Sequence, residues 1–296
     1  MTISSLSHRI AYMNTKVTIV GLGLIGGSLG MAIKKNKLAR VIGLTREKGK
    51  AAQAVKINAV DYASTNVKGL LQDADIIFVC YPIHLIITEI QKIIQFVKRG
   101  AIITDVGSTK ELIVKQAEKL MPKGVFFVGG HPMAGKEMVG LEHAEKDLFE
   151  GKNYILTTTK KTNPKALRTL KDLLSGIGAK VHVISPELHD RVVAEISHMP
   201  VAVAASLIDS VMNSGKLRSK MVALASSGFR DSTRIASGDP SLGTDMFVTN
   251  KSAVLSAIAE FKRSLSKLEA LIKKGNYQKI MDKLSQIKAF RDSIYK

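Results

Sequence analysis

The sequence predicts an α/β protein in which a Rossmann-type, doubly wound parallel sheet is followed by an all-helical C-terminal domain. A glycine-rich turn joins a strand to a helix near the start of the chain, and strands then alternate with helices as far as Ser185. Only helical periodicity follows that residue. Because 296 residues exceed the usual size of one core, we expect a polar tail over 1–13, a dinucleotide-binding sheet domain over 14–186 and a helical domain over 187–296.

The first strand, Lys16–Val20, is apolar and β-branched, and it runs into Gly21-Leu22-Gly23-Leu24-Ile25-Gly26. This G-x-G-x-x-G spacing between a strand and a helix is typical of dinucleotide-binding sites. Gly21 permits a tight turn, Gly23 lets the backbone approach a pyrophosphate, and Gly26 lets the helix pack closely on the strand. The N-terminus of the helix would face the phosphates. A glycine-rich turn without a ligand is the alternative interpretation.

Further apolar segments of strand length follow, and helical patterns separate most of them. The expected strands are Arg40–Leu44, 75–80, 101–106 and 125–128, then 153–159 and Lys180–Ile184. A helix at Pro164–Gly176 separates the last two, which we expect to extend the sheet. This alternation is typical of a parallel sheet with helices on both faces.

The dipeptide Ser185-Pro186 marks the change to helices, as an N-cap followed by proline at the first helical position. A long helix is expected over 187–212, bent at its internal Pro200. Apolar residues recur at helical spacing through 250–274, and Gly275 is the stop signal.

The formal net charge of +19 suggests a nucleic-acid-binding protein as one alternative. The lysines are spread along the whole chain, however, and no basic cluster with interleaved aromatic residues offers stacking platforms. We therefore expect no nucleic-acid partner, and we infer a general attraction for small anionic substrates.

The single cysteine, Cys80, excludes an intramolecular disulfide and fits a reducing compartment. It ends an apolar strand, so we expect a buried structural thiol and not a nucleophile. The first 13 residues are too polar for a secretory signal, and no stretch reaches the roughly 18 apolar residues of a membrane span. These observations predict a cytoplasmic protein without a membrane partner.

Thr45 and Arg46 follow the second strand, where an NAD site would carry an acidic residue for the ribose hydroxyls. A hydroxyl followed by a guanidinium suits a 2′-phosphate, because arginine can bind phosphate through two parallel hydrogen bonds. The sequence therefore favours NADP over NAD. The alternative is that Arg46 is an ordinary surface residue, as we expect for Glu47 and Lys48.

Two turns at the ligand edge of the sheet carry candidate catalytic residues. Ser108 follows the strand at 101–106 and is well placed for a ligand, although Ser108 with Glu111 also fits a capping box for the next helix. His131 follows another strand and could act as a general base near neutral pH; an inert histidine is the alternative. The other six histidines show no metal-ligand spacing, so we expect no metal site.

A third segment, 226–236, combines Arg230 and Arg234 with glycine and hydroxyl residues, which suits an anionic substrate. We expect Arg234 to bind the ligand and Arg230 to be a surface arginine beside a helix cap.

Four segments, 105–110, 130–135, 197–200 and 229–234, occur in the order seen in the prephenate/arogenate dehydrogenases of tyrosine biosynthesis. Over residues 16–262 the chain resembles this family, and it is most similar to the NADP-dependent arogenate dehydrogenases. The resemblance implies a dinucleotide-binding domain, a helical domain that forms a homodimer, and an active site in the cleft between the two.

The resemblance also implies a reaction and its residues. The substrate would lose CO2 and transfer hydride to the nicotinamide. His131 would take the proton of the ring hydroxyl, and Ser108 would assist that histidine. Arg234 would bind a substrate carboxylate, and Ser227 is a second expected substrate-binding residue.

Further roles and two departures follow from the same resemblance. Asp190 and Glu137 would belong to an ionic network at the entrance. Many members that use prephenate carry a second histidine where this chain has Val201, and many carry a tryptophan where it has Gly243. The expected cofactor-binding positions are Gly21, Gly23, Leu24, Ile25, Gly26, Thr45, Arg46, Cys80, Tyr81, Pro82, Asp105 and Gly107.

The missing histidine favours L-arogenate over prephenate as substrate, with prephenate and either NAD or NADP as the alternative. The β-hydroxyacid dehydrogenases share the two-domain plan, but they rely on a lysine in the first helix of the second domain. The helix expected over 187–212 contains no lysine.

Overall fold

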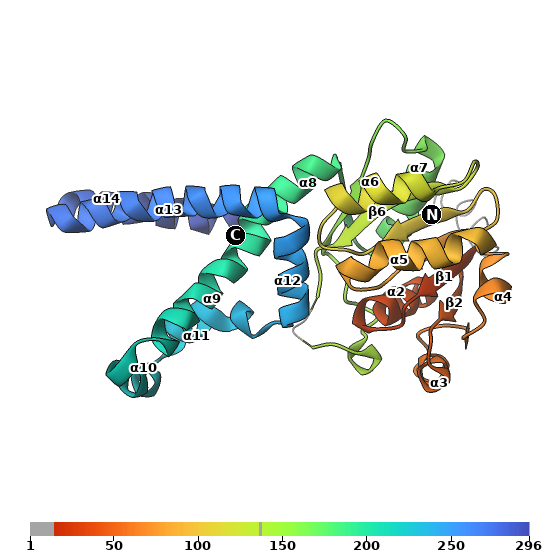
Figure 1. Ribbon diagram of the computed structural model, residues 1–296, viewed down its shortest axis with the longest axis horizontal. Coiled ribbons are helices and arrows are strands. Elements are labelled where there is room, and N and C mark those ends of the chain that lie inside the picture. Colours follow the sequence, from red (N-terminus) through yellow and green to blue (C-terminus); the bar gives the residue numbers. More distant parts are fainter. Residues whose placement is uncertain (1–14, 136–137, 296) are drawn as a thin grey trace.

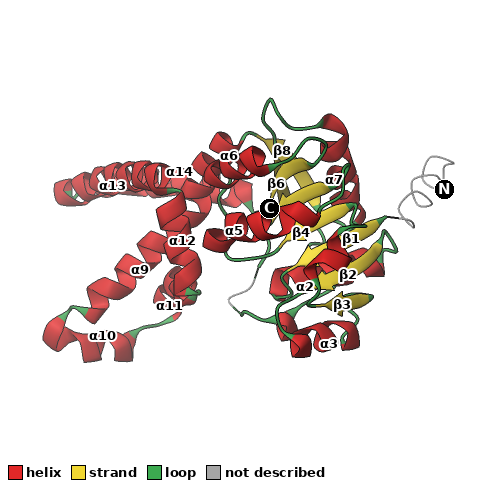
Figure 2. Cartoon of the chain, turned by 45° about the vertical axis from the view of Figure 1, so that its right-hand side comes forward, coloured by secondary structure: helices red, strands yellow, loops and turns green. Residues whose placement is uncertain are grey.

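The computed structural model describes residues 15–135 and 138–295, and within them eight strands form one sheet (Figure 1, Figure 2). The strands are β1 (Lys16–Val20), β2 (Arg40–Leu44), β3 (Tyr62–Ser64), β4 (Ile76–Val79), β5 (Ile102–Asp105), β6 (Phe126–Pro132), β7 (Asn153–Thr157) and β8 (Lys180–Ile184). A group of helices follows and extends away from the sheet. The predicted fold class is thus confirmed.

The strand order is β3-β2-β1-β4-β5-β6-β7-β8, and the strands from β1 to β6 are parallel. β7 runs antiparallel to β6, and β8 is parallel to β7. This reversal is not predicted by the sequence. It is possible because the described part of the connection over 133–152 holds one short helical turn, Leu141–His143, and no crossover helix. β3 is also missing from the prediction, because its three residues form no recognisable apolar pattern.

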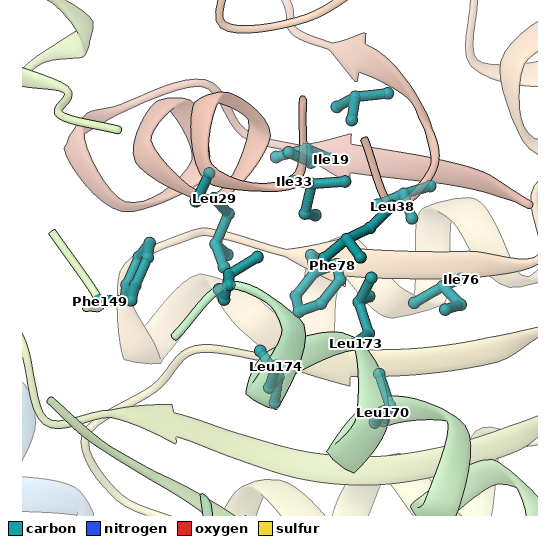
Figure 3. Packing of buried hydrophobic residues seen from close by; sticks show 14 of the residues in the cluster. Ile19, Leu29, Ile33, Leu38, Ile76, Phe78, Phe149, Leu170, Leu173 and Leu174 are labelled. Atoms are coloured by element: carbon teal, nitrogen blue, oxygen red, sulfur yellow. The ribbon is translucent and has the colours of Figure 1, made fainter. Parts of the chain in front are cut away.

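Helices cover both faces of the sheet, and each face has its own apolar core. One face carries α2 (Leu24–Lys35), α3 (Lys48–Lys56) and α7 (Pro164–Gly176); the other carries α4 (Val67–Leu71), α5 (Ile83–Ile93) and α6 (Glu111–Leu120). In β4, Ile76 and Phe78 join the first core (Figure 3), whereas Ile77 and Val79 join the second. Successive strand residues point to opposite faces, so a continuous apolar run predicts a strand covered on both sides.

The helical region begins with α8 (Pro186–Val193) and α9 (Met199–Met212), which continue one another through a π-helical turn at Ala194–His198. Ser185 caps α8, since its Oγ accepts a hydrogen bond from the Leu188 amide at 3.2 Å. The π-helical turn ends two residues before Pro200. Proline has no N–H and its ring crowds the carbonyl four residues earlier, and a wider turn relieves both problems.

The remaining helices leave much apolar surface exposed within one chain. They are α10 (Arg218–Leu224), α11 (Ser227–Thr233), α12 (Pro240–Thr249), α13 (Lys251–Lys274) and α14 (Tyr277–Ile294). Gly275 ends α13 in the left-handed conformation, with φ of 62°. No residue of α14 is buried, and Phe290 is 69% exposed. The only small core among the described helical residues contains Ala194, Val254 and Ala257.

The helix Pro186–Met212 is long and apolar enough to cross a membrane by length and composition alone, although the sequence predicts no such stretch. In this structure 22% of its most apolar window is buried. Length and composition do not distinguish a membrane span from a helix that packs against a partner subunit.

Candidate active site

A cleft of about 700 Å³ lies between the carboxyl edge of the sheet and the helices that follow it. The sheet side is formed by the glycine-rich turn after β1 and by the ends of β4, β5 and β6. Ser197, Val201, Arg234 and Asp245 lie on the helical side. Because parallel strands bring their carboxyl ends to one edge, segments far apart in the sequence meet here.

The glycine-rich turn has the shape that a dinucleotide requires. A Cβ on Gly21, whose φ is +99°, would lie 2.4 Å from the carbonyl oxygen of Cys80, and one on Gly26 would lie 2.1 Å from that of Gly21. Nothing lies within 4 Å of a Cβ on Gly23, so the backbone is open to a ligand at that point. No side chain caps the start of α2, where Leu24 and Ile25 line the cleft. The helix amides and positive dipole end therefore suit a pyrophosphate.

Thr45 and Arg46 lie directly beyond β2, outside the residues that line the cleft. Thr45 is buried, and the exposed Arg46 holds its guanidinium 5.4 Å from the centre of the Tyr81 ring. Tyr81 does line the cleft, so Arg46 flanks one end of it. No carboxylate follows β2 before Glu47, which pairs with Lys50.

Cys80, Tyr81, Pro82 and Gly107, four of the expected cofactor-binding positions, line the cleft. Burial, and then the nearby carboxylate of Asp105, raise the pKa of the Cys80 thiol, so it remains protonated at neutral pH.

Asp105, another expected cofactor-binding position, does not line the cleft. It is fully buried, pairs with the ammonium group of the equally buried Lys110, and accepts hydrogen bonds from the amides of Gly107 and Gly130 at 2.8 and 3.1 Å. Lys110 Nζ donates in addition to the Gly130 carbonyl at 2.8 Å. A buried carboxylate needs such partners, and the pair fastens the ends of β5 and β6 together beneath Ser108 and His131.

His131 lies at the end of β6, lines the cleft and is 7% exposed. Its Nδ1 lies 2.8 Å from Nε2 of His189, and the two rings meet edge to face. Burial, and then the His189 side chain and the Lys110 ammonium, hold the pKa of His131 well below its usual value. The imidazole is therefore neutral at pH 7 and can accept a proton.

His189 is held in turn by Asp190, whose Oδ1 lies 2.7 Å from Nδ1 of His189. The same carboxylate accepts the amides of Lys110 at 2.7 Å and Glu111 at 3.0 Å, which are the start of α6. Sequence reasoning missed His189, although its position beside Asp190 in the first turns of α8 was a signal. The three side chains form a continuous chain from the cleft to the α6 N-terminus.

Two predictions therefore need correction. Asp190 is 2% exposed and lies behind His131, not at an entrance. Ser108 and Glu111 form no capping box, because the Asp190 carboxylate takes the amides at the start of α6 and no side chain of the local segment caps it. Ser108 instead lines the cleft, as its functional interpretation requires. Glu137, the other expected network residue, lies outside the described residues.

On the helical side, Arg234, the expected carboxylate-binding residue, lines the cleft directly after α11. Ser227 is exposed at the start of α11 and is not part of the cleft lining, so within one chain the structure does not bring it to the site. Arg230 is exposed beside Asp231, with its Nε 3.3 Å from Oδ1, as expected for a surface arginine. Val201 lies in the cleft wall.

Hydrogen bonds hold α12 on α5 of the sheet domain and the start of α13 on α8, and sequence patterns did not reveal them. Asp245 accepts the His84 amide at 3.2 Å and lies 2.8 Å from His84 Nδ1. Asn250 donates to the carbonyl of Asp190 at 2.7 Å. Among residues 15–135 and 138–295, no group of three or more His, Cys, Asp or Glu side chains could hold a metal ion.

The fold and the cleft define an α/β protein with a dinucleotide-binding sheet edge that faces a helical region. Family models described as "Prephenate dehydrogenase, nucleotide-binding domain" and "Prephenate dehydrogenase, dimerization domain" match residues 29–183 and 185–286. The chain therefore belongs to the prephenate/arogenate dehydrogenase family, as its motifs predict.

Similar proteins carry names for more than one substrate. Prephenate dehydrogenase of Bacillus subtilis (strain 168) is 35% identical over 284 residues, covering 95% of this chain and 76% of the relative. Cyclohexadienyl dehydrogenase of Zymomonas mobilis is 30% identical over 258 residues, covering 86% of this chain and 88% of the relative. The crystal structure of Synechocystis arogenate dehydrogenase matches with a TM-score of 0.84 and 38% identity, covering 95% and 100%. The crystal structure of prephenate dehydrogenase from A. aeolicus, in complex with hydroxyphenyl propionate and NAD+, matches with a TM-score of 0.89 and 33% identity. The match covers 95% of this chain and 98% of that one.

Proposed function

We propose that this chain is an NADP-dependent arogenate dehydrogenase, which converts L-arogenate to L-tyrosine in aromatic amino acid biosynthesis. The observation that carries the proposal is the buried, neutral His131 in a cleft that also presents Arg234 and the apolar Val201. The first two suit the ring hydroxyl and a carboxylate, which arogenate and prephenate share. Val201 lies where the two substrates would be distinguished.

The residues of the sheet edge fit a dinucleotide, with the pyrophosphate at the start of α2 and the adenosine end near Thr45 and Arg46. When bound, the nicotinamide supplies the hydride acceptor. The absence of an acid directly after β2 and the guanidinium of Arg46 support NADP. NAD is the second candidate, because the A. aeolicus relative is similar over 95% of this chain and holds NAD+.

The proton chemistry follows from the neutral imidazole of His131. Its free nitrogen accepts the hydroxyl proton while hydride leaves the ring carbon that bears the hydroxyl. The ring carboxylate departs as CO2, the ring becomes aromatic, and the proton can return to the phenolate oxygen. Arg234 would hold a carboxylate of the substrate, which aligns the ring with His131.

The choice of arogenate rests on the side chain that the two substrates do not share. Prephenate carries an α-keto acid and arogenate an amino acid, and the Val201 side chain can neither donate nor accept a hydrogen bond. A buried keto group without a partner costs about 1–3 kcal/mol, which favours arogenate by roughly tenfold or more in kcat/KM. The ammonium group of arogenate would be recognised elsewhere in the cleft.

Steady-state assays with each substrate and each cofactor test this proposal. We expect the highest kcat/KM for arogenate with NADP, and a gain in prephenate turnover for Val201→His. The second candidate is prephenate dehydrogenase activity, which the similarity to the Bacillus subtilis enzyme supports. Equal turnover of the two substrates by the native protein would refute arogenate specificity and leave the family activity standing.

We also propose that the chain is a cytoplasmic homodimer that pairs through its helical region. The exposed apolar side chains of α9 and α14 support pairing, because isolated monomers rarely leave so much apolar surface in contact with water. The description of the matching C-terminal family model as a dimerization domain agrees with it. The lone, half-buried Cys80 is consistent with a reducing compartment.

A further inference from the structure

The hydrogen bonds behind His131 run in one direction, and the direction begins at Asp190. The amides of Lys110 and Glu111 can only donate, and they occupy both carboxylate oxygens, at 2.7 Å on Oδ1 and 3.0 Å on Oδ2. Asp190 is thus an acceptor on both oxygens, and its carboxylate lies at the N-terminus of the ten-residue α6, where the first helical amides need an acceptor. It follows that Nδ1 of His189, 2.7 Å from Oδ1, must carry a hydrogen and donate it.

A neutral imidazole that donates from Nδ1 can only accept at Nε2. Burial is the main reason that the pKa of His189 lies below its usual value, with Asp190 opposing the effect, so the ring is neutral at neutral pH. Nε2 of His189 lies 2.8 Å from Nδ1 of His131, and one of these two nitrogens must donate. Since Nε2 of His189 is the acceptor, the donor is Nδ1 of His131.

We propose that His189 is a positioning residue that holds the proton of His131 on Nδ1, so that Nε2 of His131 offers its lone pair to the cleft. This inference rests on the proposed function for its kinetic consequence, but the position of the proton is a property of the protein alone. Free histidine favours the opposite tautomer, with its proton on Nε2, which could not accept a proton from a substrate. His189 thus selects the tautomer that the chemistry needs.

The same contacts stabilise the charged state of the base. After Nε2 of His131 takes the hydroxyl proton, its Nδ1–H still donates to His189, and His189 still donates to the Asp190 carboxylate. No proton moves beyond His131 in this step. The amide of Asn250, which donates to the Asp190 carbonyl at 2.7 Å, ties the end of this chain of contacts to the start of α13.

Two substitutions at position 189 separate positioning from packing. Asparagine places its amide at the same number of bonds from the backbone as Nδ1, so His189→Asn keeps a donor for Asp190 but cannot reach His131. Glutamine places its carbonyl at the same number of bonds as Nε2, so His189→Gln restores an acceptor for His131. The exposed His182, on β8, offers a matched control as His182→Gln.

The decisive measurement is the tautomer of His131 in the native protein at pH 8, from two-bond proton–nitrogen correlations of 15N-histidine-labelled protein. The His131 signal is identified by its loss in His131→Asn. We expect the proton on Nδ1; a proton on Nε2 overturns the proposal. This result needs no substrate, so it stands even if the native protein turns over neither arogenate nor prephenate, which would refute only the proposed function.

Kinetics of the variants, on protein whose circular dichroism matches the native spectrum, provide the second test. We expect His189→Asn to lower kcat by roughly 10²-fold with substrate and cofactor KM within about threefold, because positioning of a general base acts on the chemical step. His189→Gln should recover at least about tenfold of that loss, and His182→Gln should match the native enzyme. Equal kcat in the native protein and His189→Asn, or equal losses in both position-189 variants, overturns the proposal.

Discussion

His131 combines the two properties that a general base needs at a single residue: a lowered pKa and a fixed hydrogen-bond partner. Burial, and then His189 and Lys110, favour the neutral ring, and the contact with His189 orients it. The exposed 7% of the residue faces a cleft of about 700 Å³, so a substrate can reach it. Such a combination is typical of catalytic histidines.

Replacing His131 by asparagine keeps a polar side chain but removes proton acceptance at neutral pH. We expect His131→Asn to lower kcat by roughly 10²–10⁴-fold with nearly unchanged cofactor affinity, because the glycine-rich turn is untouched. Steady-state kinetics and a cofactor titration by fluorescence quenching measure the two quantities. A kcat close to the native value would exclude the proposed role.

Arg46 is the residue that separates the two cofactors in our proposal. Its guanidinium already lies over the Tyr81 ring, 5.4 Å from the ring centre, so it is partly oriented before a ligand binds. Arg46→Ala should raise the KM for NADP about tenfold or more, from loss of a charge-assisted contact to the 2′-phosphate, and leave the KM for NAD nearly unchanged. Lys50→Ala, one turn into α3, is the control for a general loss of positive charge. Equal kcat/KM for NAD and NADP in the native protein would contradict the assignment.

At the scale of elements, the start of α6 shows how a helix of one domain is completed by the other. The local sequence offers Ser108 and Glu111 for capping, but Asp190 of α8 supplies the carboxylate from 80 residues further along the chain. The same side chain holds His189. The packing of α8 against α6 therefore also positions His189 behind His131.

The apolar stripe of α14 is the element that we expect to pair two chains. Leu284, Ile287 and Phe290 are 49%, 49% and 69% exposed on this helix. Ile287→Glu combined with Phe290→Glu should shift the protein towards monomer, because each charge would have to be buried in the pairing surface. Light scattering coupled to size-exclusion chromatography measures the mass.

The control for this pair is Gln278→Glu with Ser285→Glu. It adds the same charge to the same helix, on the side away from the stripe by the spacing of 3.6 residues per turn, where side chains are exposed and polar. We expect it to remain dimeric. An unchanged mass for the apolar variant would show that α14 does not form the interface.

At the scale of the whole molecule, three buried histidines make folding depend on pH. Burial is the largest cause that lowers the pKa of His131, His189 and His198, the last to about 4. Below the unfolded value of about 6.5, the unfolded chain binds protons that the folded chain does not. The free energy of unfolding therefore decreases as the pH falls from about 6.5 towards 4. Above that range the three rings are neutral in both the folded and the unfolded chain, so they no longer change it.

Urea unfolding at several pH values checks this prediction. For His198 alone, the loss between pH 7.5 and pH 5 amounts to about 2 kcal/mol. His198→Gln should flatten this part of the profile, whatever its effect at pH 7.5, whereas His182→Gln at an exposed site should leave the slope unchanged. A native profile that is flat from pH 7.5 to 5 would contradict the burial of these rings in neutral form.

Sequence patterns alone determined the features that depend on neighbours within a few residues. The glycine-rich turn, the buried strands, the Ser185 cap and the Gly275 stop arise from backbone sterics and local hydrogen bonds, and the structure has all of them. The order of the family's motifs also predicts that Ser108, His131 and Arg234 share one cleft, and all three line it.

Only the tertiary structure decided what depends on residues far apart in the chain. β7 runs antiparallel to β6, and Asp105 is buried against Lys110. Ser227 lies outside the cleft of one chain, and Asp190 lies behind the base instead of at the entrance. The contact between His131 and His189 joins residues 58 positions apart, and no local periodicity encodes such a pair. It exists because the packing of α8 against the sheet edge excludes water there, and buried polar groups must then find partners in one another.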